Sequence, residues 1–92
     1  MVNLNFIIKK IGHVRTGISP RTGNYGLVRD IILLHVDKMG VKNYICATAT
    51  YLHSCDLKAG DKVSAELRFR TRQLPNCQIA NNIQVVHITK IS

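Results

Sequence analysis

A row of cationic side chains at every second position is the feature of this sequence with the clearest chemical consequence. Within residues 60–72, GDKVSAELRFRTR, the cations Arg68, Arg70 and Arg72 alternate with uncharged residues. Such alternation is typical of a half-buried β-strand, whose successive side chains point to opposite faces. Side chains two residues apart then lie about 7 Å from each other on one face. The arginines therefore form a positive row suited to the phosphates of an extended polyanion.

The other parity of this segment is apolar and is predicted to face the core, with Phe69 buried there as Phe6 is in the first apolar segment. A charged face can also serve only to keep a strand edge solvated. Arg15 and Arg21, which lie in a turn-rich stretch, and Lys62, which lies beside the row, favour the binding interpretation. Basic residues clustered on one face are the expected footprint of a nucleic-acid site.

Aromatic side chains on the same surface would complement these cations. Tyr44 shares its parity with Lys42 and is predicted on an exposed face, where it can stack on a base or pack against a neighbouring strand. Tyr25, next to a Gly-Asn turn, is a second stacking candidate. The predicted nucleic-acid-binding set is Arg15, Arg21, Tyr25, Lys42, Tyr44, Lys62, Arg68, Arg70 and Arg72.

Composition supports a polyanionic partner. The chain has 92 residues, enough for one domain over 1–92, and its 13 Lys and Arg against 5 Asp and Glu leave a net charge of +8. Nucleic acid is the first candidate, an acidic protein the second and an anionic membrane the third. No basic amphipathic helix is visible, which disfavours the membrane. The apolar run at 31–34 is too short to span a bilayer.

Catalytic and metal chemistry find little support. Cys46, His53, Cys55 and Cys77 lack the close spacing of structural zinc ligands, and the cysteines are predicted to be buried small hydrophobic residues. Their odd number disfavours a disulfide framework, and the first charges follow the apolar residues, the reverse of a secretory signal. We therefore expect a cytoplasmic protein. Asp30 has no carboxylate partner for acid–base work and is predicted to be a hydrogen-bonded structural group. No enzyme activity, cofactor or metal is expected.

The elements that position these residues are five strands. A turn at 37–40 joins two of them, and residues 52–60 allow one helical turn capped near Ser54 and ended by Gly60. The stretch 15–24 is predicted to be an exposed loop, because it is rich in Gly, Pro and Asn. The first strand is predicted to bend near 10–12, and the last to carry a bulge near 85–86. The predicted strands are 2–14, 25–37, 41–51, 60–72 and 77–91.

Five strands with a long first loop describe an all-β chain. Small curved sheets usually close, because open edges promote aggregation. The order and lengths fit the five-stranded Greek-key barrel called the OB-fold, with at most one short helical turn between the third and fourth strands. Ligands bind to one face of that barrel and to its first and fourth loops.

Segment 60–72 also resembles a known family. The bacterial single-stranded DNA-binding proteins carry the pattern Gly-x-x-Val-x-x-Glu-Gly-x-Leu-Arg-Thr-Arg in their fourth strand, although Leu67 stands here for the second Gly. The resemblance implies sequence-tolerant binding of single-stranded nucleic acid, more of DNA than of RNA, in replication, repair or recombination, by a homo-oligomer. The matching residues are Gly60, Val63, Glu66, Phe69, Arg70, Thr71 and Arg72.

Departures from that family leave alternatives open. The chain has no Trp, which the family uses for stacking, although the position of Tyr44 is similar to that of one such Trp. The shortened connection after the third strand, and the absence of an acidic Gly-rich tail in these residues, are similar to the primosomal replication protein type. Residues 60–67 also resemble a run of translation initiation factor one, which implies a ribosome or RNA binder. An adapter domain that docks an acidic protein is the other alternative.

Overall fold

A computed structural model describes residues 2–19 and 23–91 of the chain. Within them, the strands follow one another in the order β1 to β6, and a single 3-10 turn, η1, lies between β4 and β5. The bounds are β1 Val2–Ile11, β2 Arg15–Ile18, β3 Tyr25–Val36, β4 Lys42–Thr50, η1 Tyr51–His53, β5 Lys62–Gln73 and β6 Ile79–Lys90.

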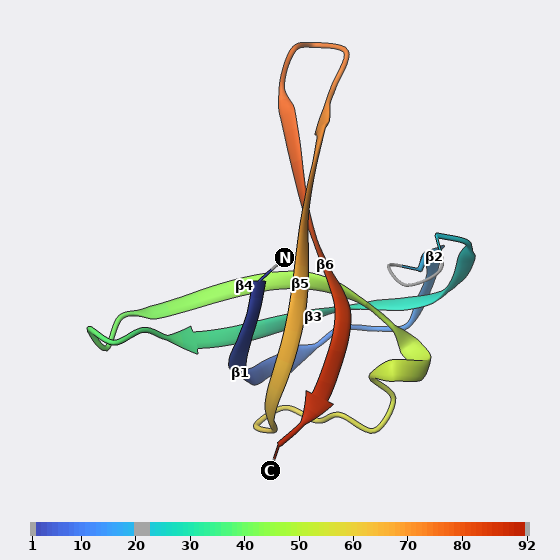
Figure 1. The fold of residues 1–92 in the computed structure, drawn as a ribbon. Helices are drawn as coiled ribbons and strands as arrows, with labels where there is room; N and C mark the ends of the chain where they lie inside the picture. The colour runs from blue at the N-terminus through green and yellow to red at the C-terminus, as the bar shows by residue number, and fades with distance from the viewer. Residues whose placement is uncertain (1, 20–22, 92) are drawn as a thin grey trace.

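Five of these strands close into a barrel (Figure 1). β1 pairs antiparallel with both β3 and β5, β3 pairs with β4, and β5 pairs with β6. A parallel contact, with Thr48 opposite Gln84, joins β4 to β6 and closes the ring. This mixed five-stranded barrel is OB-fold-like, and it confirms the predicted all-β fold class.

The core follows from the alternation of side chains. Phe6 and Ile8 of β1, with Ile31 and Leu33 of β3, are at most 2% exposed. The small side chains of Ala47, Ala49 and Ala65 also point inward and are 1% exposed. A small barrel needs both large and small residues to fill its tapered interior. The weak strand propensity of these alanines is therefore outweighed by the space they must fit.

Two irregularities bend the strands around the barrel. The register of β1 against β3 shifts between Ile8 and Lys10, close to the predicted bend. The register of β5 against β6 shifts beside Glu66, which confirms the bulge predicted near 85–86. Beyond β1, the Gly12 N–H donates to the Asp30 carbonyl oxygen at 2.8 Å. A Cβ at Gly12 would lie 3.1 Å from that oxygen, so the close approach favours glycine.

Part of the predicted loop at 15–24 is wrong, because residues 15–18 form the strand β2. Its register runs from Arg15 opposite Val28 to Ile18 opposite Tyr25. The Ser19 N–H also donates to the Asn24 carbonyl oxygen at 2.8 Å. Backbone pairing with the long β3 therefore sets this segment despite its turn-forming composition.

Two other predictions about the connections need correction. Cys46, Cys55 and Cys77 are exposed rather than buried. Cys46 lies on the outward parity of β4, and the other two lie in connecting segments, where apolar character alone does not provide a core position. The helical turn is η1, and Ser54 stands at its C-terminal end, not at its start. Gly40 and Gly60 have φ values of 82° and 96°, as expected for turn glycines.

Arg29 is a buried cation that the sequence pattern does not reveal. Its side chain lies on the inward parity of β3 and is 8% exposed. Its Nε donates to Ser54 Oγ at 3.0 Å, and its guanidinium carbon lies 5.6 Å from the centre of the Tyr51 ring. Among the described residues, its Nη2 has no hydrogen-bond partner. A buried guanidinium without a carboxylate keeps much of its desolvation cost.

We expect Arg29→Met to leave the free energy of unfolding unchanged or to raise it by about 1 kcal/mol, because an apolar chain of similar length removes the desolvation cost. Arg29→Ala should lower it by about 2 kcal/mol, because a cavity remains. Urea unfolding of the two variants measures both values. Equal destabilisation by Met and Ala would contradict this account of the buried cation.

Candidate nucleic-acid interface

The outward face of β5 carries the predicted cationic row. Arg68 is half-buried and Arg70 exposed, while Val63, Ala65 and Leu67 on the opposite parity are buried. Among the described side chains, Lys62, Arg68 and Arg70 have no ion-pair partner, since the two pairs present are Arg15–Asp30 and Lys90–Asp61. The side chain of Arg72 lies outside the described part of the structure, as does the whole of Arg21.

A line of polar side chains crosses the barrel from β3 to β5. Asp30 stands opposite Thr48, Thr48 opposite Gln84, and Gln84 opposite Arg68. Paired residues point to the same face of a sheet, so these four side chains share the outer surface. Arg15 of β2 extends the line at the β3 end. We call Arg15, Asp30, Thr48, Gln84 and Arg68 the polar belt.

Asp30 organises one end of the polar belt. Its Oδ1 accepts a hydrogen bond from Thr48 Oγ1 at 3.0 Å and one from Arg15 Nη2 at 3.2 Å. The prediction of a hydrogen-bonded structural carboxylate is thus confirmed. Arg15 was predicted as a free phosphate ligand, whereas here it is half-exposed and ion-paired. A phosphate would have to share this cation with the carboxylate.

The two predicted stacking residues are separated. Tyr44 is 59% exposed, on the outward parity of β4 with Thr48, and faces solvent beside Leu34. Tyr25 is 80% exposed, but it lies at the far end of the β3–β4 ladder, on the other parity. At about 3.3 Å per residue, nine ladder positions separate them by about 30 Å. Tyr44 therefore shares the surface of the polar belt, and Tyr25 does not.

Tyr25 contributes to a different hollow. With Leu27 and Leu52 it lines an apolar depression of about 290 Å³, which Ser19 and Thr50 also border. Lys42 lies on the Tyr44 side of the molecule, two residues along β4 and on the same parity. Lys62 stands at the start of β5, about 20 Å along the strand from Arg68. The structure therefore groups Lys42, Tyr44, Arg68, Arg70 and the ion-paired Arg15, but not Lys62 or Tyr25.

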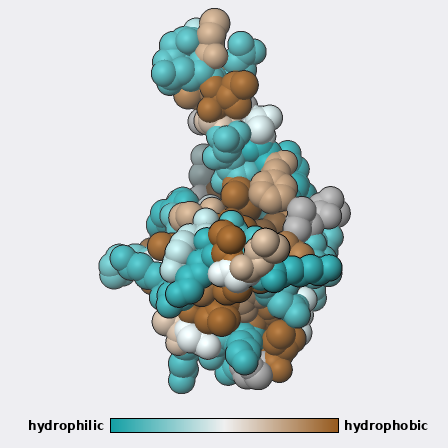
Figure 2. All heavy atoms as spheres, turned by 90° about the vertical axis from the view of Figure 1, so that its left-hand side faces the viewer, coloured by the Kyte–Doolittle hydropathy of each residue, from teal (hydrophilic) through white to brown (hydrophobic). Residues whose placement is uncertain are grey.

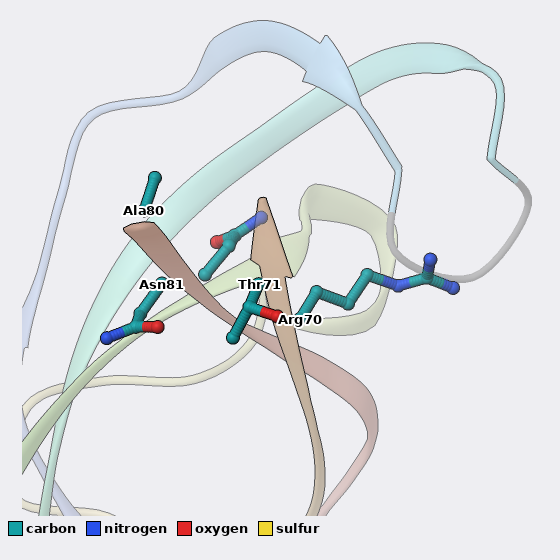
Figure 3. A pocket seen from close by; sticks show the side chains of 5 residues that line it. Arg70, Thr71, Ala80 and Asn81 are labelled. Carbon is teal, nitrogen blue, oxygen red and sulfur yellow. The ribbon is translucent and has the colours of Figure 1, made fainter. Parts of the chain in front are cut away.

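The outer halves of β5 and β6 form an arm that projects beyond the barrel (Figures 1 and 2). Near its base, Arg70, Thr71, Ala80, Asn81 and Asn82 line an open hollow of about 400 Å³. Figure 3 shows the Arg70 side chain extending away from β5. Asn82 stands directly opposite Arg70, so an amide lies beside this cation.

Phe69 corrects another prediction. It was placed in the core by its parity, but it is 55% exposed, whereas Phe6 is 2% exposed. Its partner across the ladder is Ile83, and both lie where the strands leave the barrel. The inward parity has no barrel interior beneath it there. Phe69 is therefore a third exposed aromatic residue, found only from where β5 leaves the barrel.

Comparisons with known proteins identify no family. No family model matches the chain, and no curated protein matches it either. The resemblance to single-stranded DNA-binding proteins therefore stays a prediction based on residues 60–72. None of the helices formed by the described residues has the length and apolar character needed to cross a membrane. Within the same residues, His, Cys, Asp and Glu side chains form no group of three suited to a metal ion.

Truncating the two phenylalanines should give different results. We expect Phe6→Ala to lower the free energy of unfolding by about 3–5 kcal/mol, because it empties the core. Phe69→Ala should cost less than about 1 kcal/mol, because the ring is largely hydrated already. Chemical denaturation compares them directly. A cost at Phe69 close to that at Phe6 would show that the arm packs against apolar surface in solution.

Proposed function

We propose that this protein binds single-stranded nucleic acid, DNA in preference to RNA, with the face formed by β4, β6 and β5. The observation that carries the proposal is that Arg68 and Arg70 stand unpaired on the same outer surface as the exposed Tyr44. Cations hold the phosphates without reading the sequence. An exposed aromatic ring stacks on an unpaired base, which a duplex does not offer.

The charge of the chain supports the same proposal. A net charge of +8 on 92 residues attracts a polyanion over a long range and favours rapid association. Replication, repair and recombination are the processes that expose single-stranded DNA, and they fit the resemblance of residues 60–72. A reducing, cytoplasmic setting is part of the proposal, because three exposed thiols persist best there.

A homo-oligomer also belongs to the proposal. Large apolar side chains are exposed away from the polar belt, among them Phe69 and Ile79 on the arm and Ile91 after β6. A chain of this length buries a limited core, and association would cover part of this surface. The same apolar residues favour a second candidate function, an adapter whose basic face docks an acidic protein. The translation-factor-like alternative would appear as ribosome association.

Salt dependence tests the electrostatic part of the proposal. With four or five phosphate contacts, we expect the logarithm of the association constant to fall with the logarithm of salt concentration with a slope of about −3. Replacing Arg68 and Arg70 together by Gln should weaken binding of a labelled oligonucleotide and make the slope shallower by about 1.4. Fluorescence anisotropy over a range of salt concentrations gives both quantities.

Lys58→Gln is the control for this experiment, because Lys58 is an exposed cation in the turn before β5, far from Arg68 along the chain. It should leave the slope nearly unchanged. Affinity independent of salt, or equal for single-stranded and duplex DNA, would contradict the proposal.

Stacking is tested at Tyr44. We expect Tyr44→Ala to weaken oligonucleotide binding by about 1–3 kcal/mol, because a base loses its aromatic platform, and Tyr44→Phe to retain most of the affinity. Tyr25→Ala, which removes an equally exposed ring at the other end of the ladder, should have little effect. Titrations of the three variants give the comparison. Full binding by Tyr44→Ala, with loss of an acidic protein partner instead, would favour the adapter.

A further inference from the structure

We propose that Asp30 makes this surface selective among nucleobases. Its free carboxylate oxygen accepts a hydrogen bond from the exocyclic amine of a base, so that cytosine is held more tightly than thymine or uracil. This inference rests on the proposed function, because it concerns a strand bound over the polar belt. It changes the expected behaviour from sequence-tolerant binding to a measurable preference.

The first support is the hydrogen bonding of the carboxylate. Oδ1 of Asp30 is occupied by Thr48 Oγ1 at 3.0 Å and by Arg15 Nη2 at 3.2 Å. Within the described residues, Oδ2 has no hydrogen-bond partner, and the side chain is 47% exposed. An ionised carboxylate accepts only, through both oxygens. A fixed acceptor, oriented by two neighbours, therefore faces solvent on the proposed binding surface.

The second support is the position of this acceptor among cations. Arg15 lies on one side of Asp30, and Arg68 lies three strands away across the polar belt, about 14 Å at the usual strand spacing. A carboxylate repels phosphate, so the backbone of a bound strand is held at the cations rather than over Asp30. A base, rather than a phosphate, then lies above the carboxylate.

The third support is the chemistry of base edges. Cytosine presents its N4 amine as a donor, whereas thymine and uracil present the O4 acceptor at the same place. Their N3–H donor lies between two carbonyl oxygens, both of which a carboxylate repels. An acceptor-only group therefore separates these pyrimidines, although they are alike in size and stacking surface.

The test uses labelled oligo-dC and oligo-dT of equal length, titrated by fluorescence anisotropy at mildly alkaline pH, where cytosine is unprotonated. We expect the wild-type protein to bind oligo-dC about fivefold more tightly, which corresponds to one net hydrogen bond. In Asp30→Asn, Oδ1 can still accept from Thr48 and Arg15, but an amide donor replaces Oδ2. The preference for oligo-dC should disappear, while the affinity for both oligonucleotides rises because a negative charge is lost.

Glu66→Gln is the matched control. It removes one negative charge from the outward parity of β5, so it should strengthen binding of both oligonucleotides equally and keep the preference. Equal binding of oligo-dC and oligo-dT by the wild type, or a preference unchanged in Asp30→Asn, would overturn the role of Asp30 and leave the proposed function standing. Binding of neither oligonucleotide would overturn both.

Discussion

The parallel contact between β4 and β6 is the constraint on which the surface of this protein depends. In residues 2–19 and 23–91, the pairing of these strands consists of Thr48 opposite Gln84. This contact turns an open sheet into a ring and brings together two hairpins that are far apart in sequence. Without it, Tyr44 and Arg68 would lie on opposite edges of an open sheet.

The length of the strands explains what lies outside the ring. β3, β5 and β6 have 12 residues each, about twice the common length of a strand. A barrel built from 92 residues has an interior only a few residues deep, so the remaining lengths must project. The β5–β6 arm is the largest projection, and its two faces are both solvated (Figure 2). The same strand is therefore scaffold at Val63 and exposed surface at Phe69.

Much of this architecture could be predicted from the sequence, because parity is a local property. The alternation at Val63, Ala65 and Leu67 fixes the inward face of β5, and with it the outward face of Arg68 and Arg70. Parity does not tell where a strand leaves the barrel, which is why Phe69 was assigned wrongly. It also does not reveal that two strands as distant as β4 and β6 pair, so Thr48 and Gln84 were missed as parts of the site.

Arg29 and Asp30 illustrate what the pattern hides and what the fold does with it. As neighbours on β3, they carry opposite charges but point to opposite faces, so neither can neutralise the other. Arg29 is left inside the barrel with Ser54 and Tyr51. Asp30 instead finds Arg15, because β2 places Arg15 opposite Val28 and thus diagonal to Asp30. The short strand that its composition disguises as a loop is therefore what positions the cation that holds this carboxylate.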